Sequence, residues 1–138
     1  MASCLPQTTS KDMDVSCALV CCHLPRLSAE EEGKMSELIK LFMGHAVADF
    51  ALQNQFVADF KNPLKDASMF GATIWPYVLL SHGAIHGATV WLITGRMDLA
   101  LYETAAHSVI DYLKCTKQIG WHLDQWGHLG CKVLWWLL

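Results

Sequence analysis

Charged side chains are scarce in this 138-residue sequence, at 17% of its residues against roughly 25% in an average soluble domain. The deficit is uneven, because residues 69–138 hold eight of the 23 charged residues and residues 67–95 hold none. No cluster of lysine and arginine is present and the net charge is −3, which excludes a surface for a nucleic-acid backbone. The chain is too short for two domains of ordinary size. The second half therefore has the composition of a protein embedded in lipid.

The first 34 residues lack the features of a targeting signal. The apolar stretch 15–24 is short and interrupted by cysteines, so we exclude a secretory signal peptide. Cys21 lacks the small preceding residue of a lipoprotein cleavage site. Four of the six cysteines lie here, and we interpret them as reduced thiols of an irregular tail, with a soft-metal cluster around His23 as the alternative. The codons for glutamate and glycine before Met35 can form a ribosome-binding site, which would make Met35 the true start of the protein. We therefore expect residues 1–34 to be a disordered or artefactual extension.

Residues 35–138 are predicted to form an all-α domain, a four-helix transmembrane or interfacial bundle. An amphipathic helix is expected from Ser36 to about Gln55, followed by a separate interfacial segment at 56–75. Residues 76–95 are the candidate membrane span, because Pro76 suits a first helical turn and about 20 residues cross a bilayer core. Two more helices are expected at 99–114 and 121–138. The last contains several tryptophans, which favour membrane interfaces.

Each of these four helices carries two candidate metal ligands spaced by four residues. Side chains at i and i+4 lie on one face of a helix, so both members of a pair can bind one centre. A single helical histidine is more often a hydrogen-bonded core residue, but eight ionisable groups in register within an apolar region favour a shared function. The candidate ligands are His45, Asp49, His82, His86, His107, Asp111, Asp124 and His128. The neighbouring candidate catalytic residues are Gln53, Lys114 and Gln125.

The charge of this set favours a metal centre over a network of hydrogen bonds. Its three carboxylates and five neutral imidazoles carry −3, so two divalent ions leave +1 for a hydroxide or a phosphate oxygen to neutralise. Mixed histidine and aspartate ligation suits Zn, Mn or Fe, and we expect one or two such ions. Because paired metals generate hydroxide near neutral pH, the pattern favours a metal-dependent membrane hydrolase.

The four pairs are expected near one face of the membrane, if the first helix ends near Gln55. By the positive-inside tendency this face is cytoplasmic, because its connections carry Lys61, Lys65, Lys114 and Lys117. A site near the lipid headgroups predicts a phosphate-bearing lipid or nucleotide-lipid substrate, with Lys114 holding a phosphate oxygen. The expected partners are therefore the lipid bilayer and this substrate.

Four ordered motifs in residues 38–134 resemble the domain of unknown function 3307 family, small membrane proteins of bacteria and their phages. The motifs are His45-Ala-Val-Ala-Asp49-Phe50 with Gln53, the His82/His86 pair, His107-Ser-Val-Ile-Asp111-Tyr112-Leu113-Lys114 and Asp124-Gln125-x-x-His128. The resemblance implies the inner membrane of a bacterium or of a phage-infected host, and it implies no particular activity. A more distant likeness links the pattern to membrane-bound, metal-dependent hydrolases under SOS control, which is an analogy only.

Other functions are compatible with the same residues. The main alternative is a non-enzymatic protein or small transporter, in which the His/Asp array relays protons or binds metal in transit. Haem held between histidines is disfavoured, because three carboxylates would be buried beside the porphyrin. A phage protein that modifies the host envelope through a partner is a further alternative.

Overall fold

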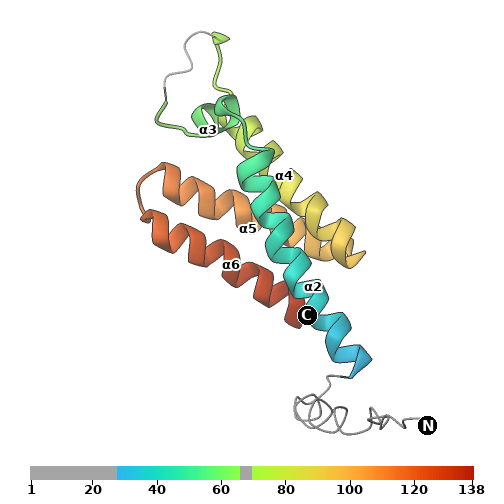
Figure 1. Cartoon of the computed structure of the whole chain (residues 1–138). Helices are drawn as coiled ribbons and strands as arrows, with labels where there is room; N and C mark the ends of the chain where they lie inside the picture. Colours follow the sequence, from blue (N-terminus) through green and yellow to red (C-terminus); the bar gives the residue numbers. More distant parts are fainter. Residues whose placement is uncertain (1–27, 66–69) are drawn as a thin grey trace, which may run out of the picture.

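The computed structural model describes residues 28–65 and 70–138, and these ranges contain helices and no strand (Figure 1). The prediction of an all-α protein is therefore confirmed for the described residues. Expectations about residues 1–27, including the cysteine-rich tail and His23, lie outside them. The elements are α2 (Ala29–Ala46), a π-helical segment η1 (Val47–Ala51), α3 (Gln55–Phe60), α4 (Trp75–Thr94), α5 (Met97–Cys115) and α6 (Trp121–Leu137).

Helix α2 begins at Ala29 rather than at the expected Ser36, because the preceding residues form a capping box. The Ser28 hydroxyl accepts a hydrogen bond from the Glu31 amide at 3.3 Å, and the Glu31 carboxylate accepts one from the Ser28 amide at 2.9 Å. Three glutamates in the first turn also suit the positive end of the helix dipole. The domain boundary at residue 35 stays a prediction.

The expected first helix does not continue to Gln55 as one α-helix. After Ala46 it widens into the π-helical segment η1, where the Leu52 amide donates to the Val47 carbonyl at 3.1 Å. The chain then turns, and the Asn54 side chain accepts from the Val57 amide at 2.9 Å to begin α3. Short π-helical turns occur often at functional sites. Here the segment contains Asp49, and α3 is a separate helix.

Helices α2, α4, α5 and α6 pack together as a bundle, with α5 and α6 side by side (Figure 1). The closest approach joins α4 to α5 at two glycines. A Cβ atom added at Gly87 would lie 2.5 Å from the Ala100 carbonyl oxygen, and one at Gly83 would lie 2.9 Å from that of Thr104. Side chains larger than hydrogen would therefore push the two backbones apart. Because His82 and His86 precede these glycines, the close packing brings both histidines against α5.

Polar side chains occupy the middle of the bundle, and large apolar ones lie outside it. The buried apolar cluster is small, consisting of Leu41, Val90, Leu99 and Trp135 at one end. Phe50 and Leu92 are each 79% exposed and Tyr77 is 74% exposed. Among the described residues, buried polar and charged side chains thus outnumber buried apolar ones, which is unusual for a folded domain.

The predicted membrane span at 76–95 lies in α4, where Pro76 stands in the first turn as expected. Within residues 28–65 and 70–138, however, no helix has both the length and the apolar character that a bilayer crossing requires. In α4 the histidine pair and its glycine, serine and threonine neighbours interrupt the apolar residues. The prediction of a transmembrane helix is therefore not supported.

Candidate metal centre

The eight predicted ligands all come together inside the bundle. Seven of them are buried, and the side chain of Asp49 is 15% exposed. Spacing by four residues puts both members of each pair on the inner face of their helix, as the sequence predicts. The pairs lie on α2 and η1, α4, α5 and α6, and comprise His45 and Asp49, His82 and His86, His107 and Asp111, and Asp124 and His128.

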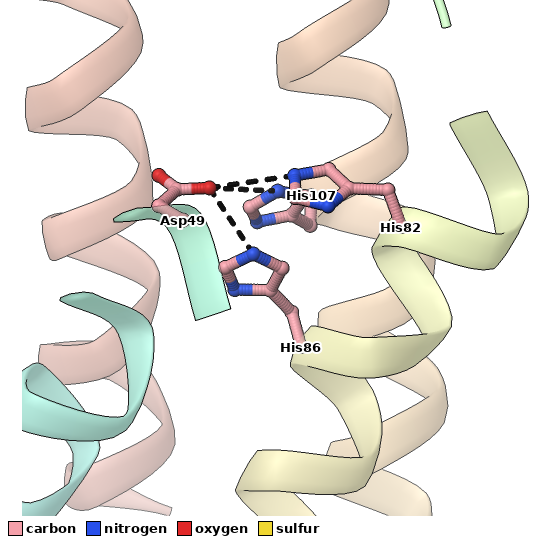
Figure 2. Close-up of side chains that lie close together, drawn as sticks. All are labelled: Asp49, His82, His86 and His107. Carbon is pink, nitrogen blue, oxygen red and sulfur yellow. Dashed lines mark ion pairs between the residues drawn. The ribbon is translucent and has the colours of Figure 1, made fainter. Parts of the chain in front are cut away.

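The tightest group consists of the Asp49 carboxylate and three imidazoles. Asp49 Oδ1 lies 3.2 Å from His86 Nε2, 3.4 Å from His82 Nε2 and 3.9 Å from His107 Nε2 (Figure 2). One ligand atom from each residue lies within 4.8 Å of the other three. Ligands about 2.1 Å from a tetrahedral zinc ion are about 3.4 Å apart, so this spacing matches that of a metal site.

Several nitrogen atoms in this group have no hydrogen-bond partner among the described residues. They include the Nε2 atoms of His82, His86 and His107. A buried polar atom that forms no hydrogen bond costs about 1–3 kcal/mol, and three such atoms aimed at one carboxylate are hard to explain by packing alone. Lone pairs on these nitrogens are the electron donors that a divalent metal ion requires.

A second group of ligand atoms shares His107 with the first. It comprises His107, Asp111 and His128. Its carboxylate is already neutralised, because the Lys61 ammonium donates to Asp111 Oδ2 at 2.5 Å. Asp124 is also paired, at 3.5 Å from Lys114 Nζ. The two groups therefore differ in charge, and only the first contains a carboxylate without a lysine partner among the described residues.

The candidate catalytic residues lie beside this second group. Gln125 Nε2 donates to Asp124 Oδ2 at 3.0 Å, and Gln53 Oε1 accepts from Lys61 at 2.6 Å. Lys114 contacts Asp124, as described above. All three therefore contact the network of the predicted ligands directly or through one lysine, and their catalytic role stays a prediction.

Sequence reasoning missed a buried cluster beneath His107. The Glu103 carboxylate accepts hydrogen bonds from Lys132 Nζ and, at 2.5 Å, from Trp135 Nε1. It also lies 3.6 Å from His107 Nδ1, on the far side of the ring from Asp49. A carboxylate at the second nitrogen of a ligand histidine typically fixes the tautomer and orientation of the ring. The missed signal was the spacing, since Glu103 precedes His107 by four residues and Lys132 follows His128 by four.

The neighbouring lysines change the charge of the centre. With Glu103 there are four buried or nearly buried carboxylates, and with Lys61, Lys114 and Lys132 there are three ammonium groups close to them. With neutral imidazoles the set carries a net charge of −1, in place of the −3 expected from the eight ligands alone.

Burial favours the neutral, metal-binding form of three of these imidazoles. Burial lowers the pKa of His45 to about 4 and that of His107 to about 2, and it also lowers the pKa of His86. Burial alone raises the pKa of the Asp49 carboxyl, but the imidazoles of His82 and His86 outweigh it and hold that pKa below its usual range. At neutral pH His86 and His107 therefore present neutral nitrogens to an ionised Asp49 carboxylate.

Comparison with known families gives one match, to a family described as "Protein of unknown function (DUF3307)", over residues 38–138. This range includes all eight predicted ligands and confirms the resemblance seen in the four motifs. No curated protein and no solved structure matches the chain significantly.

Proposed function

The chain belongs to the DUF3307 family of proteins of unknown function, and we propose that it binds a single divalent metal ion between α4, α5 and η1. The proposed ligands are Asp49, His82, His86 and His107. The observation that carries this proposal is the convergence of three imidazole Nε2 atoms on one carboxylate oxygen at 3.2–3.9 Å, where none of the three has a hydrogen-bond partner in the described part of the chain. One carboxylate and three imidazoles suit Zn, Mn or Fe.

The charge of the surroundings supports one ion rather than two. A net charge of −1 becomes +1 with one divalent ion, which a single anionic ligand neutralises. A second ion would bring the net charge of the four carboxylates, three lysines and two ions to +3. It would also have to displace Lys61 from Asp111, where the ammonium nitrogen lies 2.5 Å from the carboxylate. We infer that Lys61 stands where a second cation would otherwise bind.

We propose a hydrolase as the activity of this centre. A divalent ion bound there would supply Lewis acidity to a carbonyl or phosphoryl oxygen. The chain itself contributes the rest: Glu103 orients His107, while Lys61 and Lys114 present ammonium groups beside the ligands. The alternative is a protein that relays metal or protons without turnover. It is favoured by an unbroken series of contacts, in which His128 lies against both Asp124 and His45.

We also propose that the bundle associates with a lipid bilayer at its interface, in the inner membrane of a bacterium or of a phage-infected host. The exposed apolar side chains support this, among them Phe50 and Leu92 at 79% exposure each. Large apolar side chains exposed in this number favour contact with an apolar partner such as lipid.

Metal analysis of the purified full chain tests the proposal. We expect about one equivalent of metal in the wild type and near zero in the His82→Ala/His86→Ala variant. His122→Ala is the matched control, because His122 is exposed and belongs to no candidate ligand group among the described residues. Circular dichroism establishes that each variant is helical. A folded wild type that takes up no Zn, Mn or Fe would falsify the metal centre, and metal without turnover of an ester such as p-nitrophenyl phosphate would favour the alternative.

A further inference from the structure

A cavity of about 260 Å³ lies next to the candidate metal centre, between α3 and the end of α5. Its polar lining consists of three lysines and two amides, namely Gln53, Lys61, Asn62, Lys114 and Lys117. Among the residues that the structure describes, no carboxylate lines it. The cavity therefore has the donors and the charge of an anion-binding site.

Two of these lysines connect the cavity to the metal centre. Lys61 is only 4% exposed, and its ammonium donates both to Asp111 Oδ2 and, at 2.6 Å, to Gln53 Oε1. Lys114 Nζ lies 3.5 Å from Asp124 Oδ2, and its side chain is partly exposed. Each of these ammonium groups thus pairs with a carboxylate of the predicted ligand set, on a residue that also lines the cavity. Lys117 has no such partner among the described residues, so it supplies the positive charge of the lining that is left for a ligand.

The third lysine is held in a backbone conformation that lysine rarely adopts. Lys117 has φ of 62°, in the left-handed region, directly after the end of α5. Glycine or asparagine is usual at such a position, and another residue costs about 1–2 kcal/mol there. The turn is closed by the amides of Lys117 and Gln118, which donate to the Lys114 and Leu113 carbonyls at 2.9 Å each. Strain that persists beside a candidate site favours a role for the side chain.

We propose that this cavity binds the phosphate group of a phosphate monoester. Such a group carries up to two negative charges and three terminal acceptor oxygens, which match the three ammonium groups of the lining. Because Gln53 Oε1 already accepts from Lys61, the amide keeps its N–H groups for a ligand. A volume of about 260 Å³ also leaves room for part of the alcohol that the phosphate esterifies.

This assignment deepens the proposed function by naming its substrate class. Hydrolysis rests on the proposed metal centre: a water oxygen bonds to phosphorus, the bond from phosphorus to the alcohol oxygen breaks, and a proton from the water passes to the alcohol. Phosphate binding in the cavity does not require the metal, because none of the residues in the lining is one of the four proposed ligands.

The test is a calorimetric titration of the metal-free full chain with inorganic phosphate at low ionic strength. We expect Lys117→Gln to weaken phosphate binding about three- to tenfold. Lys65→Gln is the matched control, because Lys65 is exposed, pairs with Asp59 at 3.2 Å and does not line the cavity, so its loss should leave binding unchanged. Lys117→Gly should weaken binding equally while raising the melting temperature, since glycine relieves the backbone strain.

Sedimentation with vesicles distinguishes the sources of the phosphate. Phosphatidate vesicles present a monoester, and phosphatidylcholine vesicles are the control. Binding of phosphatidate alone, reduced by Lys117→Gln and not by Lys65→Gln, supports the cavity with a lipid as the source, and binding of free phosphate supports a water-soluble one. If neither probe binds, or if both variants weaken binding equally, the assignment is overturned. If the chain binds phosphate but never takes up metal, the proposed hydrolase is refuted and the assignment of the cavity as a phosphate site still holds.

Discussion

The imidazole of His86 is stacked on that of His107, with ring centroids 3.6 Å apart and planes inclined by 19°. Two imidazolium ions at this distance would repel each other, so the two rings are not both charged, in agreement with the pKa values of both histidines, which burial lowers. Neutral stacked rings keep their Nε2 atoms directed at Asp49 from two different helices. The packing of α4 against α5 and the chemistry of the site therefore depend on each other.

Gly87→Ala should destabilise the protein by about 2 kcal/mol, since overpacking a close contact typically costs 1–3 kcal/mol. The added Cβ would lie 2.5 Å from the Ala100 carbonyl oxygen, so α4 would have to move away from α5. Urea unfolding followed by circular dichroism measures the change. Gly130→Ala is the control, because nothing lies within 4 Å of its Cβ position in α6, and it should stabilise by up to about 1 kcal/mol. Equal effects of the two variants would contradict the close α4–α5 contact.

Lowering the pH below 6.5 should destabilise the metal-free protein. Burial holds the pKa of His45 at about 4 in the folded chain, against about 6.5 when unfolded, so between these values the unfolded chain binds more protons. Stability therefore falls as pH falls, by up to about 3 kcal/mol for this histidine alone. Chemical unfolding at several pH values measures this slope. It should be shallower in His45→Gln and unchanged in His122→Ala, and a flat wild-type profile from pH 6.5 to 4 would refute the buried neutral state.

Glu103→Gln should weaken metal binding about 10- to 100-fold, because it removes the carboxylate next to His107 Nδ1. The substitution also leaves the buried Lys132 ammonium without its counter-ion, which costs about 3–5 kcal/mol of stability. Glu103→Gln/Lys132→Met removes that charge and should restore much of the stability. Competition with a metal chelator and thermal unfolding separate the two effects. If the double variant regains wild-type metal affinity, Glu103 acts only through folding.

Metal at 100 times its dissociation constant should stabilise the wild type by about 2.7 kcal/mol, because it binds the folded chain alone. Asp49→Asn should abolish this gain, since it removes the carboxylate on which three imidazoles converge. Asp59→Asn is the control, as Asp59 pairs with Lys65 away from the centre. Scanning calorimetry with and without metal measures the shift, which should saturate at one equivalent. Saturation only at two equivalents would contradict the single-ion proposal.

The eight ligands could be predicted from sequence because helical periodicity fixes which side chains share a face, and two residues four apart need no knowledge of the fold. Glu103 was within reach of the same rule. Lys61 was not, because its contact with Asp111 joins residues 50 positions apart and depends on where α3 packs. Asp49 lies with the imidazoles, as its spacing from His45 predicts, but the hydrophobic pattern gives no sign of the π-helical segment that contains it.

The membrane prediction failed to gain support for a physical reason. Composition registers how many apolar residues a segment has, whereas a bilayer crossing requires that they be nearly uninterrupted along one helix. In α4 the residues that interrupt them, His82 and His86, are those that build the site. The second half has few charged residues because histidines supply much of its buried polar interior, while many of its exposed side chains are apolar.

The π-helical segment also limits which insertions and deletions this chain can tolerate. A π-helical turn holds one residue more than an α-helical turn, so a one-residue deletion within Val47–Ala51 would return the chain to ordinary α-helical hydrogen bonding. A deletion between His45 and Asp49 would also reduce their spacing from four residues to three, so Asp49 would no longer point, as the π-helical turn directs it, at the three imidazoles. The shorter sequence would form the more regular helix and lose the carboxylate of the centre. Selection for the site would thus appear in descendants as a fixed length between His45 and Asn54, even where the side chains in between are free to vary.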